Sequence, residues 1–234
     1  MINFEIYKSG RIIRYEENTQ LFNKEKINTL FIFHGLYGRG KNWQSFAKKI
    51  SENEKTTVVT VDLRNHGENI FKENMSYIIM MEDIFHLFNY LKIKKTNLLG
   101  HSMGGKLAML ITLLRPNYIN KLIIADIAPI NYINDNQNII DALFNLDLTL
   151  VRNRNHADEL LSNEIEQKFL RSFLLQNIKL SDGKYKWSIN LTSIKNTMNN
   201  LRSFPKIDKN NKVDTKSLCI YGQKSDYVNE NHFQ

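Results

Sequence analysis

Cysteine is almost absent from this chain of 234 residues, and glycine and proline are scarce. The single cysteine, Cys219, has no partner for a disulfide within the chain, which excludes a small disulfide-stapled scaffold and favours a reducing compartment. No internal repeat and no long low-complexity tract is visible. The chain therefore does not belong to the repeat, fibrous or disulfide-rich classes.

Long hydrophobic runs are also missing. No stretch approaches the roughly 18 consecutive apolar residues that a membrane span requires. The longest runs, Leu30–Phe33 and Leu122–Ile124, have the length of strands. Near the N-terminus, Glu5, Lys8 and Arg11 interrupt any apolar core of a signal peptide. We therefore expect a cytoplasmic protein without a membrane span.

The composition is that of an ordinary globular protein, with 42% hydrophobic and 24% charged residues. The length suits one sizeable α/β domain with an insertion. The net charge of +8 raises the question of nucleic-acid binding. Basic residues are spread along the chain, however, and aromatic residues are not interleaved with them as base stacking requires. We expect no nucleic-acid partner.

Short apolar strands alternate with amphipathic segments through the first half of the chain. A hairpin is expected across Ser9-Gly10, between Asn3–Tyr7 and Arg11–Tyr15. Buried strands are then predicted at Leu30–Phe33, Val58–Val61, Leu98–Leu99, Leu122–Ala125 and Leu218–Tyr221. Helices are predicted at Trp43–Ile50, Tyr77–Leu91 and Lys106–Leu114. This alternation predicts the α/β class, with a mostly parallel sheet and helices on both faces.

The strand rhythm stops after Pro129. Residues 135–187 suggest successive helical segments with no strand between them, as in a helical cap inserted above a sheet. We therefore expect a hydrolase-like core at 1–133, a helical cap at 134–200 and a resumed core at 201–234.

The segment Gly100-His101-Ser102-Met103-Gly104-Gly105 carries the most specific chemical signal. A serine hydroxyl is a weak nucleophile unless a sharp turn exposes it beside a base. The G-x-S-x-G pattern makes that turn between a strand and a helix, and its glycines avoid collisions between the two. Here it follows a predicted strand and opens a predicted helix. We therefore predict Ser102 as the catalytic nucleophile.

Acyl transfer also needs donors that stabilise a developing oxyanion. The backbone N–H of Met103, at the start of the helix, is one candidate. The second is expected in His34-Gly35-Leu36-Tyr37-Gly38, which follows an earlier strand, and we choose the N–H of Leu36. Asp62–Gly67 follows the next strand and is expected to form a rim of the pocket, with Arg64 and His66 organising that loop.

These segments resemble the YbfF-type esterases, a cap-bearing branch of the α/β-hydrolase superfamily. The resemblance rests on His34–Gly38, Val61–Gly67, Leu99–Lys106, Lys121–Pro129 and Asp182–Trp187, and it covers nearly the whole chain from Thr29 onward. It implies the α/β-hydrolase fold and cleavage of small acyl esters or acyl-CoA thioesters through an acyl-enzyme intermediate. It implies no cofactor and no metal. The oligomeric state is not indicated.

The resemblance also leaves two candidates for the catalytic acid. Many superfamily members carry it after the strand that here ends at Tyr221, where Asp226 lies. The YbfF type carries it after the preceding strand, where Asp126 lies. We favour Asp126 and keep Asp226 as the alternative.

The general base is the departure from the family pattern. In this superfamily the histidine follows the acid, on a loop after one further strand. The histidines of this chain are His34, His66, His86, His101, His156 and His232, and none is expected to be the base. We therefore expect the last strand and helix to be missing and this polypeptide to be a truncated or decayed, catalytically impaired relative. The alternatives are a C–C hydrolase or acyltransferase on the same fold, or a non-catalytic acyl-binding protein.

Overall fold

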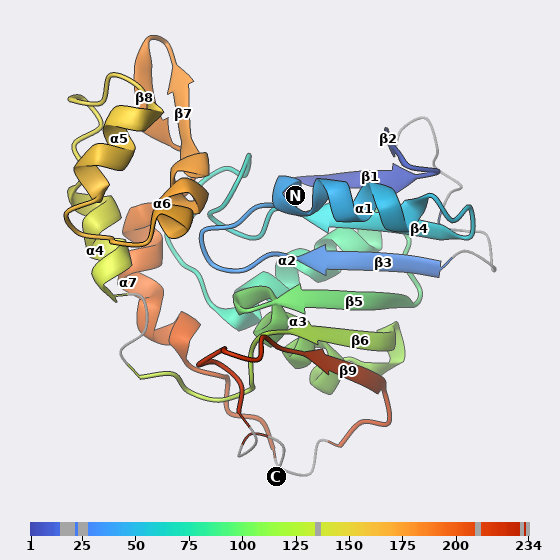
Figure 1. The fold of residues 1–234 in the computed structure, drawn as a ribbon. Coiled ribbons are helices and arrows are strands. Elements are labelled where there is room, and N and C mark those ends of the chain that lie inside the picture. Colours follow the sequence, from blue (N-terminus) through green and yellow to red (C-terminus); the bar gives the residue numbers. More distant parts are fainter. Residues whose placement is uncertain (15–21, 23–27, 134–136, 209–211, 230–231, 233–234) are drawn as a thin grey trace.

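A computed structural model describes residues 1–14, 22, 28–133, 137–208, 212–229 and 232 of the protein. Its centre is a seven-stranded sheet in the order β2-β1-β4-β3-β5-β6-β9 (Figure 1). The strands are β1 (Phe4–Lys8), β2 (Arg11–Ile13), β3 (Asn28–Phe33), β4 (Thr56–Val61), β5 (Thr96–His101), β6 (Ile119–Ala125) and β9 (Lys216–Ile220).

The sheet is mostly parallel. β1 pairs antiparallel with both β2 and β4, while β4, β3, β5, β6 and β9 run parallel to one another. The predicted hairpin across Ser9-Gly10 is confirmed, and Tyr15 lies outside the described residues. Because parallel strands end at the same edge, the loops after β3, β4, β5 and β6 meet there.

Helices cover both faces of the sheet, as predicted. α1 (Gln44–Ser51) lies on one face, and α2 (Tyr77–Tyr90) and α3 (Met103–Leu114) lie on the other (Figure 1). α2 begins at Ser76, whose side chain accepts a hydrogen bond from the N–H of Ile79 at 3.3 Å. Short 3₁₀ turns occur at η2 (Gly40–Trp43), η3 (Pro116–Tyr118) and η4 (Leu175–Asn177).

The main core lies between the sheet and the pair α2 and α3. Phe31 of β3 is fully buried and meets Phe88 of α2 edge to face, with ring centroids 4.8 Å apart. Burying a side chain of this size stabilises the fold by roughly 1.5–3 kcal/mol. α3 is buried from Met103 to Thr112, so the helix that follows Ser102 is held rigidly against the sheet.

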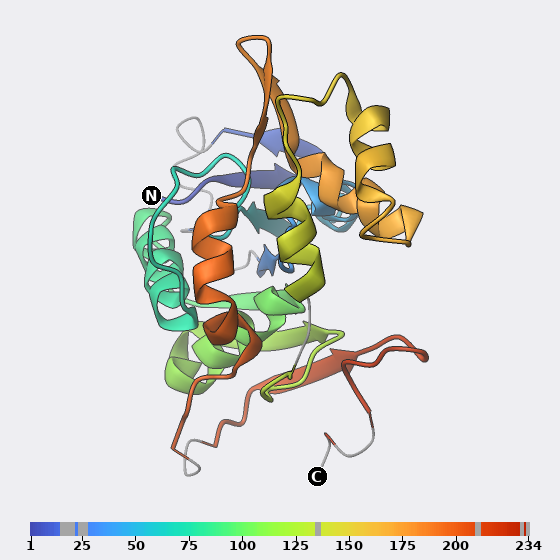
Figure 2. The ribbon, with the colours of Figure 1, turned by 90° about the vertical axis from the view of Figure 1, so that its left-hand side faces the viewer.

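A second group of elements lies beyond the carboxyl ends of the parallel strands (Figure 1). It consists of α4 (Gln137–Asn145), α5 (Arg154–Leu161), α6 (Lys168–Leu174), the hairpin β7 (Ile178–Ser181) and β8 (Lys184–Trp187), and α7 (Leu191–Arg202). α4 and α7 pack side by side above the core (Figures 1 and 2). The division at residues 134 and 200 stays a prediction.

The hairpin corrects one expectation, since a strand-free segment was predicted for residues 135–187. Asp182 and Gly183 both have left-handed backbone angles, with φ of 52° and 72°, and this allows a two-residue turn. The Asp-Gly pair and the alternating Lys184–Trp187 are sequence signals of a hairpin, but the surrounding helical periodicity obscured them.

Within the described ranges, no helix combines the length and the apolar character needed to cross a lipid bilayer.

Candidate functional site

Ser102 stands at the junction of β5 and α3, as the sequence predicted. Its backbone has φ of 49° and ψ of −117°, a conformation that non-glycine residues rarely adopt. The N–H of Ser102 donates to the carbonyl of Ala125 on the neighbouring strand at 3.0 Å, and its carbonyl accepts the first hydrogen bond of α3 from Lys106 at 3.0 Å. These bonds hold the strained turn in place, with the serine side chain half-buried beside a cavity.

The glycines on either side of Ser102 are required by close backbone contacts. A Cβ atom on Gly100 would lie 2.2 Å from the carbonyl oxygen of Gly104. A Cβ atom on Gly104 would lie 2.4 Å from the carbonyl oxygen of Phe33, at the end of β3. Both contacts are with backbone atoms, which cannot rotate away. The turn therefore depends on glycine at both positions.

We predict that Gly100→Ala lowers the free energy of unfolding by about 3 kcal/mol or more, because β5 or α3 must move to admit the methyl group. Urea denaturation followed by circular dichroism measures the change. Gly222→Ala is the matched control, since a Cβ there would meet its nearest neighbour at 3.7 Å. A Gly100→Ala variant as stable as Gly222→Ala would show that the turn tolerates a side chain.

The His34–Gly38 loop lies directly against the nucleophile turn. A Cβ atom on Gly35 would come within 2.8 Å of Nδ1 of His101 and 3.3 Å of Cβ of Ser102. Leu36 and Ser102 both line the same cavity. The structure therefore brings together two segments that are separated by more than sixty residues in the sequence.

The two predicted oxyanion donors are positioned near this turn. In the described part of the chain, the N–H of Leu36 has no hydrogen-bond acceptor. The N–H of Met103 belongs to the first turn of α3, where amides lack an intrahelical partner and carry the positive end of the helix dipole. Both residues line the cavity with Ser102. Their role in binding an oxyanion stays a prediction.

Two buried histidines support the Leu36 loop from beneath. Nε2 of His34 accepts a hydrogen bond from the N–H of Leu63 at 2.9 Å, and its Nδ1–H donates to the carbonyl of Gly35 at 2.8 Å. Nε2 of His66 accepts from the N–H of Tyr37 at 3.2 Å, and its Nδ1–H donates to the carbonyl of Arg64 at 2.8 Å. Both rings must be neutral to make these bonds. They bind backbone, so they connect the loops after β3 and β4.

Burial keeps these two imidazoles neutral. It lowers the pKa of His34 from 6.5 to about 4, against a smaller opposing effect of its bond to Gly35. Burial likewise lowers the pKa of His66 from 6.5 to about 3, and the neighbouring His34 adds to this effect. Burial also lowers the pKa of His101, while Asp126 opposes that shift.

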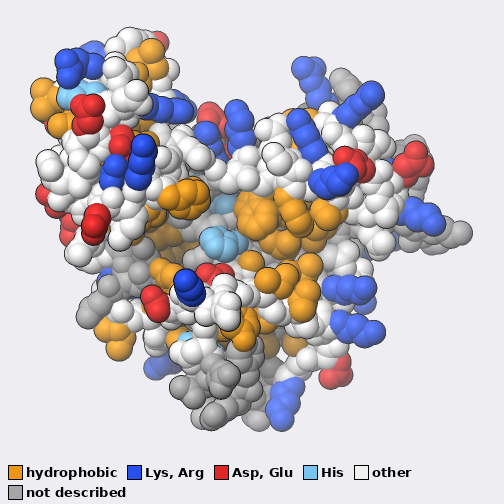
Figure 3. All heavy atoms as spheres, viewed as in Figure 1, with side chains coloured by type: hydrophobic (Ala, Val, Ile, Leu, Met, Phe, Trp, Pro, Cys, Tyr) orange, Lys and Arg blue, Asp and Glu red, His pale blue; other side chains and the backbone are white. Residues whose placement is uncertain are grey.

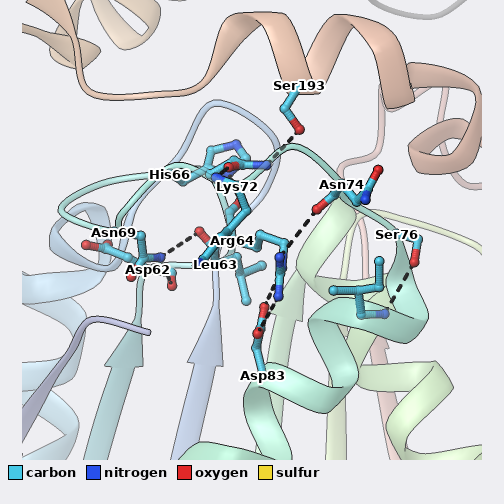
Figure 4. Close-up of polar contacts among 12 residues, drawn as sticks. Asp62, Leu63, Arg64, His66, Asn69, Lys72, Asn74, Ser76, Asp83 and Ser193 are labelled. Carbon is cyan, nitrogen blue, oxygen red and sulfur yellow. Dashed lines mark hydrogen bonds and ion pairs between the residues drawn. The ribbon is translucent and has the colours of Figure 1, made fainter. Parts of the chain in front are cut away.

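The loop after β4 is organised by a polar network (Figure 4). The guanidinium of Arg64 donates to both carboxylate oxygens of Asp83 on α2, each at 2.7 Å, and both side chains are only 17% exposed. The carboxylate of Asp62 accepts from the N–H groups of Gly40 and Glu68 at 2.7 and 3.0 Å. Arg64, like His66, therefore shapes the loop and does not point to the serine.

Asn65 in this loop is bonded to the start of α7. The side-chain N–H of Asn65 donates to Oγ of Ser193 at 2.8 Å, and the backbone carbonyl of Asn65 accepts from the backbone N–H of Asn190 at 2.9 Å. Oγ of Ser193 donates in turn to the backbone carbonyl of Glu73 at 2.7 Å. The N-terminal end of α7 is thereby attached to the core.

Of the two candidate acids, Asp126 directly follows the strand next to that of the nucleophile. His101 of β5 pairs with Ala125 of β6, so Ser102 and Asp126 are the next residues on adjacent parallel strands. Asp126 also has a left-handed backbone, with φ of 57°, and its carboxylate accepts from the N–H of Gly222 at 3.2 Å. Asp226 is exposed, beyond the end of β9. This geometry favours Asp126, whose role as the acid stays a prediction.

A cavity of about 40 Å³ opens beside Ser102. Apolar side chains and a histidine gather in the hollow between the helical group and the sheet (Figure 3). The cavity is lined by Leu36, Tyr77, Ser102, Met103, Lys106, Ile127, Tyr132, Met198, Leu201, Arg202 and Tyr227. The sequence analysis missed the contributions of Tyr132 and α7. The amphipathic pattern of α7 was a signal of packing, but it did not show what the helix packs against.

No imidazole among the described residues forms a hydrogen bond with the Ser102 hydroxyl. His34 and His66 bind backbone groups, His86 and His156 lie on α2 and α5, and His232 accepts from the N–H of Asn229. Across the same residues, no three metal-binding side chains form a cluster. That the base lies outside these histidines stays a prediction.

Comparison with known proteins identifies the architecture. Residues 28–232 match the sequence description of the α/β hydrolase fold. A solved structure of a marine microorganism esterase superposes with a TM-score of 0.87 at 33% identity, covering 99% of this chain and 84% of that one. The fold predicted from the sequence is thereby confirmed.

Curated relatives carry esterase and lipase names. The sn-1-specific diacylglycerol lipase ABHD11 of Danio rerio is 33% identical over 220 residues, which are 91% of this chain and 69% of that protein. A putative esterase/lipase of Haemophilus influenzae is 34% identical, covering 88% of this chain and 70% of that protein. Esterase YbfF of Escherichia coli is 28% identical, covering 90% and 80%. The resemblance to YbfF-type esterases is thereby confirmed.

Proposed function

This chain belongs to the α/β-hydrolase family, and on that premise we propose that it cleaves small acyl esters through an acyl-enzyme intermediate on Ser102. The observation that carries the proposal is the strained Ser102 turn beside a cavity, at the positive end of α3. Such a turn stores strain that a purely structural serine would not need. The N–H groups of Met103 and Leu36 are the proposed oxyanion donors.

Asp126 is the proposed acid of this site. It follows β6 as Ser102 follows β5, so a histidine placed over this edge of the sheet would reach both side chains. The acid would orient and stabilise that imidazole while the imidazole removes the proton of the serine. We propose that the base is not one of the six histidines of this chain.

The cavity favours short acyl groups. A volume of about 40 Å³ holds roughly three water-sized groups, at about 10–15 Å³ each. We therefore propose a short acyl group of a few carbons. Esters and thioesters both present such a group, and acyl-CoA thioesters are included in the proposal.

The test is covalent capture of the acyl group. The protein is incubated with p-nitrophenyl butyrate or butyryl-CoA, with imidazole in solution as a substitute base, and its peptides are analysed by mass spectrometry. A butyryl group on the peptide that contains Ser102 is the expected result. Butyryl groups on surface lysines alone, with Ser102 unmodified, would refute the acyl-enzyme mechanism. Comparing the two donors decides between ester and thioester.

One observation favours a second candidate, a non-catalytic acyl-binding protein. Within the described residues, the Ser102 hydroxyl lacks a histidine partner. Calorimetric binding of butyryl-CoA without release of CoA, and without modification of Ser102, would support this candidate over the hydrolase.

A further inference from the structure

Lys106 is an unusual residue for its position. It lies one turn after Ser102 on α3 and is only 2% exposed. Lysine is almost never buried to this extent, because an ammonium group must be fully hydrogen-bonded when it leaves water. Its presence beneath the Ser102 cavity therefore calls for a specific role.

The ammonium of Lys106 binds backbone carbonyls from two other segments. Nζ donates to the carbonyl of Ile130 at 2.8 Å, to that of Arg202 at 2.5 Å and to that of Ser203 at 3.3 Å. Arg202 is the last residue of α7, so the positive charge also lies at the negative end of that helix. The side chain thus connects the helix of the nucleophile to the end of α7.

The same ammonium also contacts Tyr132, another residue that lines the cavity. Nζ lies 4.7 Å from the ring centroid of Tyr132, which lines the cavity. The hydroxyl of Tyr132 accepts from the N–H of Ala128 at 2.9 Å and donates to the carbonyl of Tyr227 at 2.6 Å. Tyr132 therefore joins the loop after Asp126 to the segment after β9.

The two ends of α7 are attached in different ways. The N-terminal end is held by Asn65, as described above, and the C-terminal end by Lys106 and by Tyr77, whose hydroxyl donates to the carbonyl of Leu201 at 2.8 Å. Met198 and Leu201, which line the cavity, lie near the C-terminal end. Loss of the Lys106 bonds would release the part of α7 that bounds the cavity and leave the other end in place.

We infer that Lys106 is a positioning residue that sets the length of the acyl group accepted at Ser102, by holding the C-terminal end of α7 and Tyr132 against the cavity. This inference rests on the proposed function, since it assumes that the cavity receives the acyl group. Lys106 does not take part in the proposed chemistry, because its donors are occupied by backbone carbonyls.

The test compares two acyl lengths in one competition. Wild-type protein and Lys106→Met are incubated with equal amounts of p-nitrophenyl butyrate and p-nitrophenyl octanoate in the presence of imidazole, and the acyl groups on Ser102 are quantified by mass spectrometry. Methionine keeps an apolar stem of similar length but has no charge. The octanoyl-to-butyryl ratio is expected to rise by about tenfold in Lys106→Met, a change within the usual range for cavity contacts.

Two further variants make the outcome decisive. Lys195→Met removes a half-buried lysine from the same helix, where it pairs with Asp141 of α4 at 2.8 Å and does not line the cavity, and is expected to leave the ratio unchanged. Tyr77→Phe loses one bond at the same end of α7 and is expected to raise the ratio, so it replaces Lys106→Met if that variant does not fold. An unchanged ratio in a folded Lys106→Met, or in Tyr77→Phe as its replacement, would overturn the inference. Failure of the wild type to carry either acyl group on Ser102 would instead refute the proposed function.

Discussion

Ser102→Ala is expected to abolish acyl transfer by this protein. The part of p-nitrophenyl butyrate hydrolysis that exceeds the rate with imidazole alone should fall by about a hundredfold or more, since general-base catalysis of about 10²–10⁴-fold at this site requires the serine nucleophile. No butyryl group should appear on the peptide that contains residue 102. The measurement is the initial rate of p-nitrophenol release as a function of imidazole concentration.

Imidazole cleaves activated esters by itself, so the Ser102→Ala protein is also the matched background. The part of the rate that depends on both imidazole and Ser102 measures catalysis at the site. Denaturation in urea should show that the variant is as stable as the wild type or slightly more stable, because the strained turn loses no hydrogen bond of its backbone. A stable Ser102→Ala protein that retains the imidazole-dependent rate would place the nucleophile elsewhere.

Acidification is expected to destabilise the fold before the carboxylates titrate. His34 and His66 have an ordinary pKa of 6.5 when unfolded, but about 4 and about 3 in the folded protein, because burial disfavours the charged rings. The unfolded chain therefore binds more protons below pH 6.5, and stability falls as the pH falls through that value. Between pH 6.5 and 5 each histidine should cost about 1.6 kcal/mol, or about 3 kcal/mol together, because the unfolded rings are already half protonated at pH 6.5.

Urea denaturation at pH 6.5, 6.0, 5.5 and 5.0 measures this loss of unfolding free energy. The four curves are fitted with one shared m value, the slope of the unfolding free energy against urea concentration. A His66→Gln variant should lose about half of the pH dependence over this range, whatever its stability at pH 6.5. His86→Gln is the control, because His86 is exposed on α2. Equal unfolding free energies at pH 6.5 and 5.0 would contradict the assignment of His34 and His66 as buried neutral residues. Since total stability of a domain is about 5–15 kcal/mol, the loss is large.

Protonation of His34 and His66 at low pH is also expected to change the Leu36 loop beside Ser102. Protonation of Nε2 of His66 removes the acceptor of the Tyr37 N–H, and protonation of His34 removes the acceptor of the Leu63 N–H. The Leu36 loop is bounded by these contacts, so it should loosen together with the fold. The two histidines thus affect the proposed oxyanion donor without contacting a substrate.

The sequence predicted the elements that depend on local chemistry. The buried strands, the helix at Tyr77–Leu91 and the Ser102 turn were found because apolar periodicity and glycine placement act within a few residues. The prediction of a strand-free segment missed the β7–β8 hairpin, because its short Asp-Gly turn lies between segments with helical periodicity. That Asp126 and Ser102 follow paired residues of adjacent strands became visible only once the register of β5 and β6 was known.

By itself, then, the amino-acid order determined the strained turn that presents Ser102, because the glycines at 100 and 104 are needed wherever a strand meets a helix so closely. Only the tertiary structure decided that Gly35 touches this turn, that Asp126 lies beside it and that Lys106 reaches the end of α7. Those contacts join residues that are far apart in the chain. They depend on strand register and helix packing. Both are set by the burial of apolar side chains from many segments in one core, so no single segment of the sequence predicts them.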